Sequence, residues 1–171
     1  MIAALYVDVD KGPYVGLGLD CWGMKRDATS YDGPAPVIAH PPCGPWGRYR
    51  HKCKQESRTA IIAVQQVRRW GGVLEHPAHS RLWDAASLPR PGELPDSHGG
   101  WSVAVEQGWW GHEAPKATWL YFVGVSPNEV KLPLHRPSAT GLVEEMPKGK
   151  RHLTPRLFAL WLIEAVGRVR I

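Results

Sequence analysis

Apolar residues in this chain gather in short runs that end at proline, glycine or an acid. The first run covers residues 3–9 and ends in acids, and a second run at 37–39 stops at His40 and two prolines. Consecutive prolines remove two backbone donors and fix φ, so they end a strand and stiffen the following turn. We therefore predict buried strands at 3–9 and 37–39, with a rigid loop after the second strand.

From residue 57 to 70 the period of the apolar positions changes. They recur at i, i+3, i+4 and i+7, which is typical of an amphipathic helix: Ala60, Ala63, Val64 and Val67. A glycine pair ends this helix, and residues 72–77 then read as a short strand that stops at proline. Strand, helix and strand in this spacing predict a βαβ unit with parallel strands and a right-handed crossover.

Two more strands are predicted at residues 101–107 and 117–125. The connection between them is too short for a crossover helix, so we expect an antiparallel hairpin. Residues 84–100 and 126–152 are rich in proline and lack periodicity, which favours surface loops.

The chain is predicted to close with a helix over residues 155–166. Thr154 would be its N-cap and Pro155 its first residue. A length of 171 residues fits one domain that can bury a full core. The fold class is therefore α/β, with a mostly parallel sheet and a C-terminal antiparallel hairpin.

The two strands of the βαβ unit carry the candidate chemistry. Parallel strands end at the same edge of a sheet, so Cys43 and Glu75 should come close together there. In open α/β folds ligands bind at this edge. Gly44 and Gly47 allow the backbone after the cysteine to bend close to a ligand. We expect a partly open loop that holds a thiol beside a carboxylate.

Composition favours an acidic partner. A net charge of +5 and an isoelectric point near 9.3 make nucleic acid the first candidate, and nine tryptophans supply rings that stack on bases or fill a core. A basic run after the cysteine loop, which includes Arg48, suits either phosphate contact or a solvated loop. The three cysteines suggest no disulfide framework, and no apolar run could cross a membrane, so we expect a cytoplasmic protein.

The order of these motifs resembles that of DNA cytosine-C5 methyltransferases. His40-Pro41-Pro42-Cys43 is similar to the Pro-Cys strand end that carries the family's nucleophile. Residues 73–77 resemble its Glu-Asn-Val strand, with Glu75 kept and His76 in place of the Asn. Residues 151–156 resemble its closing Leu-Thr-x-Arg helix. The chain also resembles short proteins of tailed bacteriophages, which would place it in a bacterial host cell.

The resemblance implies a Rossmann-like, methyltransferase-type sheet and an enzyme that modifies C5 of a pyrimidine in DNA, in RNA or in a free nucleotide. Cys43 would attack C6 of the ring, and Glu75 would bond to N3 and the exocyclic amine, with His76 and Lys116 as supporting catalytic groups. The expected cofactor is S-adenosylmethionine, held by Asp8 and Asp27. Substrate-binding candidates are His40, Pro42, Trp46, Arg48, Trp110 and His112.

The chain departs from the family in two regions. The family's Gly-rich first motif is not recognisable in residues 8–18, and too few residues separate Val9 from Asp27 for the usual helix and second strand. The cofactor region is therefore truncated, and the pocket is either rebuilt or lost. The basic segment 126–152 would stand in place of a target-recognition domain.

Two alternatives remain open from the sequence. Four competent zinc ligands lie close together, which would make the protein a basic nucleic-acid-binding module with a structural zinc: His40, Cys43, His51 and Cys53. The other alternative keeps the methyltransferase fold without catalysis, as a protein that binds nucleic acid or inhibits another protein.

Overall fold

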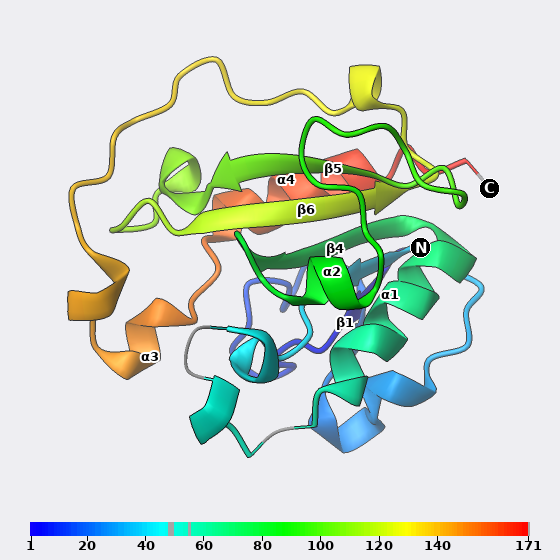
Figure 1. The fold of residues 1–171 in the computed structure, drawn as a ribbon, viewed down its shortest axis with the longest axis horizontal. Helices are drawn as coiled ribbons and strands as arrows, with labels where there is room; N and C mark the ends of the chain where they lie inside the picture. The colour runs from blue at the N-terminus through cyan, green and yellow to red at the C-terminus, as the bar shows by residue number, and fades with distance from the viewer. Residues whose placement is uncertain (48–49, 55, 171) are drawn as a thin grey trace.

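The protein folds around one mixed sheet with helices on both faces, as seen in the computed structural model, which describes residues 1–47, 50–54 and 56–170 (Figure 1). The strand order among these residues is β2-β1-β3-β4-β6-β5. Neighbours from β2 to β4 run parallel, whereas β6 is antiparallel to both β4 and β5. The strands are β1 (Ala3–Leu5), β2 (Asp20–Trp22), β3 (Val37–Ala39), β4 (Gly72–Pro77), β5 (Trp101–Glu106) and β6 (Ala117–Val123).

Two longer helices and several short helical turns complete the described structure. The α-helices are α1 (Arg58–Trp70), α2 (Leu82–Ala85), α3 (Lys148–Arg151) and α4 (Arg156–Val166). The 3-10 turns are η1 (Met24–Arg26), η2 (Ala28–Ser30), η3 (Gly44–Trp46), η4 (Arg50–Lys52), η5 (Gln107–Trp110), η6 (Pro127–Glu129) and η7 (Val143–Glu145). None of the described helices has the length and apolar character needed to cross a membrane.

The sheet separates two apolar layers because successive side chains of a strand point to opposite faces. Leu5, Ala39 and Leu74 face α1 and α2 in one buried cluster. Ile38 and Val73 face α4 in the other. The parallel strands are therefore buried on both sides, which explains why their sequences read as continuous apolar runs.

The predicted βαβ unit is confirmed. Both β3 and β4 lie where the sequence placed them, and α1 connects them. Gly72 is essential to this pairing, because its φ is +121° and an added Cβ would lie 1.9 Å from the Val37 carbonyl oxygen. The predicted antiparallel hairpin is also confirmed as β5 and β6, and β6 lies between β4 and β5.

The first thirty residues differ from the prediction. The strand expected over 3–9 ends at Leu5, because Tyr6 has a φ of 61° and turns the chain out of the sheet. A second strand, β2, pairs with β1, although the sequence predicted no room for one. The structure reaches this strand without a helix, through the turns of residues 8–18. Its three residues are too few to show a strand pattern.

Two helix boundaries also need correction. Helix α4 begins one residue later than predicted, with Pro155 at the N-cap position and no side-chain cap. Helix α2 overlaps the start of the loop predicted at 84–100. Its residue Trp83 is buried. The indole N–H of Trp83 donates to the Pro89 carbonyl at 3.1 Å, and this bond anchors the loop. Segment 126–152 has the expected irregular course, with only η6, η7 and α3 in it.

Candidate site at the carboxyl edge of strands β3 and β4

The centre of the candidate site is a contact between His40 and Glu75. Ala39 of β3 pairs with Leu74 of β4, so the next residue on each strand lies at the same level of the sheet. Both side chains point to the face covered by α4, and Nδ1 of His40 lies 2.9 Å from Oε2 of Glu75. The parallel register thus determines which two side chains meet at this edge.

Further polar side chains extend this contact on both sides. The hydroxyl oxygen of Tyr14 lies 2.6 Å from Nε2 of His40, and only 1 % of Tyr14 is exposed. On the other side, Nε2 of Gln107 donates to Oε1 of Glu75 at 3.0 Å and to the hydroxyl of Thr118 at 3.1 Å. Both carboxylate oxygens of Glu75 therefore have a partner from another segment, which fixes the orientation of the group.

Glu75 is ionised in this environment. Its burial would raise the pKa of the carboxyl, but the hydrogen bond and charge of His40, with the charges of Lys116 and His76, lower the pKa to about 2. Tyr14 responds in the opposite sense, since burial and the nearby Glu75 charge raise its pKa well above the ordinary value. A carboxylate that only accepts and a phenol that keeps its proton therefore lie at the two ends of the His40 ring.

Cys43 lies close enough to feel the charges of this site. It precedes η3 at the position where the chain turns away from the sheet. Burial and the Glu75 charge raise the pKa of its thiol, whereas the Lys116 charge lowers it. The structure thus brings the predicted nucleophile, Glu75 and Lys116 to one edge of the sheet. At neutral pH the Cys43 thiol is protonated, so reaction requires a change in its surroundings.

Lys116 is held at the end of the hairpin by its backbone and by a hydrogen bond. The residue has a φ of 47°, and its ammonium donates to the Leu153 carbonyl at 2.8 Å. Burial lowers its pKa, while the charges of Glu75 and Cys43 act in the opposite direction. Its charge acts on Glu75 and Cys43 at the same edge, and the bond ties the end of the hairpin to Leu153, just after segment 126–152.

His76 lies on the opposite face of the sheet from Glu75, because neighbouring residues of a strand alternate. The residue is buried beside Trp83, and neither ring nitrogen makes a hydrogen bond within the described part of the chain. Burial lowers its pKa to about 4, although Glu75 and the nearby Pro42 carbonyl act to raise it. The Pro42 carbonyl thus lies near His76, and the His76 ring does not share the face of the sheet on which His40 meets Glu75.

The two acids expected to hold a cofactor are used by turns of their own segments. Oδ1 of Asp8 accepts from the backbone N–H of Asp10 and of Lys11 at 2.9 and 3.0 Å. Asp27 has a φ of 48°, and its Oδ1 accepts from the backbone and hydroxyl of Thr29. Both acids are exposed. These contacts describe turn-capping residues, and nothing in them indicates a preformed cofactor pocket.

The remaining substrate-binding candidates are dispersed. Trp110 packs against Phe158 and Trp161 of α4 at ring-centroid distances of 4.9 and 4.7 Å, so it belongs to the core. His112 braces the hairpin turn, with Nδ1 2.8 Å from the Ala114 carbonyl oxygen.

Trp46 and Arg48 follow Cys43 in the chain. Trp46 packs on the face covered by α1, and its buried indole nitrogen makes no hydrogen bond within the described residues. Its carbonyl accepts from the backbone N–H of Arg81 at 3.3 Å, which ties η3 to the start of α2. Arg48, the other candidate in this loop, lies outside the described residues.

The four zinc-ligand candidates do not form a metal centre. No group of three or more histidine, cysteine or acidic side chains in the described part of the chain is arranged to hold a metal ion. Both ring nitrogens of His40 already contact Tyr14 and Glu75, and His51 is exposed on η4.

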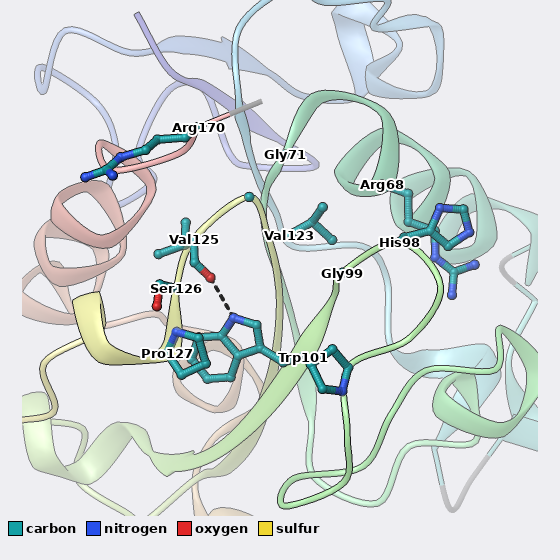
Figure 2. A pocket seen from close by; sticks show the side chains of 12 residues that line it. Arg68, Gly71, His98, Gly99, Trp101, Val123, Val125, Ser126, Pro127 and Arg170 are labelled. Atoms are coloured by element: carbon teal, nitrogen blue, oxygen red, sulfur yellow. Dashed lines mark hydrogen bonds between the residues drawn. The ribbon is translucent and has the colours of Figure 1, made fainter.

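Two cavities are found away from this edge. One, of about 440 Å³, lies beside the start of β4 and includes Arg68, His98 and Trp101, whose indole donates to the Val125 carbonyl at 2.7 Å (Figure 2). The other, of about 570 Å³, lies beside His79 and Trp119 on the α2 side. Neither Cys43 nor Glu75 lines either cavity. These two cavities are therefore not part of the candidate site.

Two residues of the polar cluster were missed by sequence reasoning. Tyr14 lies in a turn-rich segment with no periodicity, and Gln107 directly follows β5 at the start of the hairpin connection. A fully buried glutamine at a strand end is unusual, and its only sequence signal is its place between two apolar strands. The contact of Tyr14 with His40 joins positions 26 residues apart, and no local pattern encodes it.

Comparison of the chain with protein-family models, with curated proteins and with solved structures gives no match.

Proposed function

We propose that the protein is an enzyme that modifies C5 of a pyrimidine, similar to cytosine-C5 methyltransferases and built on a methyltransferase-type sheet. One observation carries the proposal: the Cys43 loop after β3 and Glu75 at the end of the parallel neighbour β4 lie at one edge of the sheet, close enough for the charges of Glu75 and Lys116 to act on the thiol. The nucleophile and the charged groups that its chemistry requires thus come together from positions far apart in the chain.

The chemistry assigned to Cys43 is attack on C6 of the ring. The Sγ–C6 bond forms, the C5=C6 π bond breaks, and C5 becomes electron-rich while charge develops toward N3. In the unbound protein Glu75 raises the pKa of the Cys43 thiol and Lys116 lowers it. Engagement of the Glu75 charge by a bound base therefore favours the thiolate at the moment when it is needed.

Glu75 also limits which substrates fit. As a carboxylate it accepts hydrogen bonds, and the exocyclic amine of cytosine is a suitable donor. A base stacked within a duplex cannot reach this edge, so the base must be unpaired in single-stranded nucleic acid, flipped, or part of a nucleotide. The net charge of +5 favours a polyanion among these. DNA is the first polymer to test.

S-adenosylmethionine is the first group donor to test. The two acids expected to hold it do not fit that role, because Asp8 and Asp27 cap turns of their own segments. Isothermal calorimetry at millimolar S-adenosylmethionine is the measurement. Absence of binding overturns methyl transfer from this donor and leaves the covalent step to be tested separately.

The covalent step has a test that needs no donor. Attack at C6 makes C5 exchange its hydrogen with solvent, so incubation of a cytosine-containing single-stranded oligonucleotide in D2O should replace the C5 hydrogen by deuterium. Cys43→Ala should abolish the exchange, while Cys21→Ala, which changes a cysteine of β2, should retain it. Nuclear magnetic resonance of the cytosine H5 signal measures both. Equal exchange by wild type and Cys43→Ala overturns the proposal.

A second candidate, a non-catalytic nucleic-acid-binding protein, is favoured by a different observation. Neither cavity described above is lined by Cys43 or Glu75, and the two acids expected at the cofactor are used by turns. Retained binding of a single-stranded oligonucleotide without C5 exchange, in wild type and Cys43→Ala alike, would support this candidate. Loss of binding as well would exclude both candidates for that ligand.

A further inference from the structure

A hydrogen-bonded chain links Tyr14 to Glu75 through His40, and the attack by Cys43 described above uses neither Tyr14 nor His40. The hydroxyl of Tyr14 lies 2.6 Å from Nε2 of His40, whose Nδ1 lies 2.9 Å from Oε2 of Glu75. The side chains of His40 and Glu75 are each 12 % exposed, and Tyr14 is buried. Three polar groups are thus aligned beside an apolar cluster of the core, with buried Gln107 bonded to the far oxygen of Glu75.

The donors and acceptors of this chain can be assigned from its chemistry. The Glu75 carboxylate has no proton to give, so Nδ1 of His40 donates to it, and Nε2 of a neutral ring then accepts from the Tyr14 hydroxyl. If His40 takes up a second proton, Nε2 becomes a donor and the Tyr14 hydroxyl rotates to accept. The chain therefore remains connected with or without one extra proton.

Several charged and titratable groups face the hydrogen-bonded chain. Charged and titratable groups act on Glu75 and Tyr14 from several elements: Lys116, His76, Cys43 and Cys21. Of the groups acting on Glu75, Lys116 donates to the Leu153 carbonyl and His76 lies on the other face of the sheet. Among the described residues, His40 is the titratable group hydrogen-bonded to the Glu75 carboxylate.

We propose that the Tyr14–His40–Glu75 chain stores the proton that a bound ring takes up at its nitrogen when Cys43 attacks. The Nδ1–H bond of protonated His40 breaks as its proton passes to Oε2 of Glu75, and the carboxyl group gives a proton to N3 of the ring, where the N3–H bond forms. His40 ends neutral and Glu75 ends ionised, so one proton has moved from imidazolium to substrate. His40 and Tyr14 are positioning residues, because they act through Glu75.

This inference rests on the proposed function for the identity of the ring, and the pH profile of C5 exchange tests it. Wild-type protein should give a bell-shaped profile, which rises as Cys43 ionises and falls as the chain loses its stored proton. His40→Asn keeps an N–H donor beside Glu75 but cannot titrate. It should reduce the maximal rate at least tenfold and keep the rising limb without the falling limb.

Matched variants separate this role from a structural one. Tyr14→Phe should reduce exchange several-fold and displace the falling limb, whereas Tyr31→Phe removes the hydroxyl of another buried tyrosine, bonded to the Ala35 carbonyl, and should leave the profile unchanged. An unchanged bell-shaped profile at full rate in His40→Asn overturns the proton store while the proposed function stands. Absence of exchange in wild-type protein at every pH overturns both.

The hydrogen-bonded chain can also be detected without substrate. In the full-length protein labelled with ¹⁵N histidine, the Nδ1–H proton of His40 should give a protected signal in the nuclear magnetic resonance spectrum. Glu75→Gln should weaken or abolish its protection, and Tyr31→Phe should not. A protected His40 signal that is insensitive to Glu75→Gln shows that the chain is not formed in solution, and thereby overturns the inference independently of activity.

Discussion

His40 and Glu75 are 35 positions apart in the chain, yet Nδ1 of one lies 2.9 Å from Oε2 of the other. The contact follows from the parallel pairing of β3 and β4, in which Ala39 lies opposite Leu74. A shift of one residue in that register would turn one of the two side chains to the other face of the sheet. The pair therefore connects the architecture of the βαβ unit directly to the chemistry at its edge.

The pKa of the Cys43 thiol should depend on the two charges beside it. Glu75→Gln removes a charge that raises this pKa, so half-maximal alkylation by iodoacetamide should move to lower pH. Lys116→Met removes a charge that lowers it and should move alkylation in the opposite direction. Mass spectrometry of the Cys43 peptide across a pH series measures both shifts.

The thiol of Cys21 supplies an internal control for that experiment. Burial and the Asp20 charge raise its pKa, and Arg26 lowers it, so neither substitution should move its alkylation profile. Parallel shifts of Cys21 and Cys43 would indicate a general loss of structure. An unshifted Cys43 profile in Glu75→Gln would show that the carboxylate does not act on the thiol.

Stability should fall on acidification because of His76. Its pKa is lowered to about 4 in the folded protein from 6.5, so the stabilising contribution of the neutral ring is complete above pH 6.5 and is lost as the pH falls toward 4. The full loss is on the order of 3 kcal/mol. Urea unfolding between pH 7 and 4 measures this slope.

His76→Leu is the matched variant for the acid slope. It replaces a ring without hydrogen bonds, in the described part of the chain, by an apolar side chain, so stability at pH 7 should be retained while the slope between pH 6.5 and 4 flattens. The contribution of Glu75, whose pKa is lowered from 4.5 to about 2, is lost only at still lower pH and should remain. A slope unaltered by His76→Leu would contradict this assignment.

Gly72→Ala should destabilise the protein by roughly 2–4 kcal/mol. A Cβ at this position would meet the carbonyl oxygen of Val37 in the paired strand, and the φ of +121° disfavours any residue with a side chain. Gly149→Ala is the control, because an added Cβ there has open space and should change stability by less than about 0.5 kcal/mol. Thermal unfolding of the two variants checks the prediction.

Trp110 was expected to bind substrate, and its surroundings now predict a mainly structural effect. Trp110→Ala removes a buried ring from between Phe158 and Trp161, and should cost roughly 3–5 kcal/mol of the free energy of unfolding. Trp109→Ala should cost less, because that ring is only partly buried under the Arg136 guanidinium. Equal losses measured by urea unfolding would contradict the difference in burial.

Local pattern was sufficient for the elements that place the candidate site. The apolar run at 37–39 ends at two prolines, and the helical period from residue 58 to 70 ends at glycines, so β3, α1 and β4 followed from short-range rules. Alternation along β4 also fixes His76 on the face opposite Glu75, a consequence that we did not draw from the sequence. The placement of Glu75 and the Cys43 loop at one edge of the sheet followed from strand direction alone.

The sequence by itself determined the βαβ unit, the hairpin and the sheet edge that bears Cys43 and Glu75, because each depends on periodicity and chain-breaking residues within a few positions. Only the tertiary structure decided which groups surround Glu75. Tyr14 and Gln107 reach it from distant segments, and β2 forms where the sequence shows no strand pattern. Such contacts depend on packing between elements, and packing is a property of the folded chain that no local window contains.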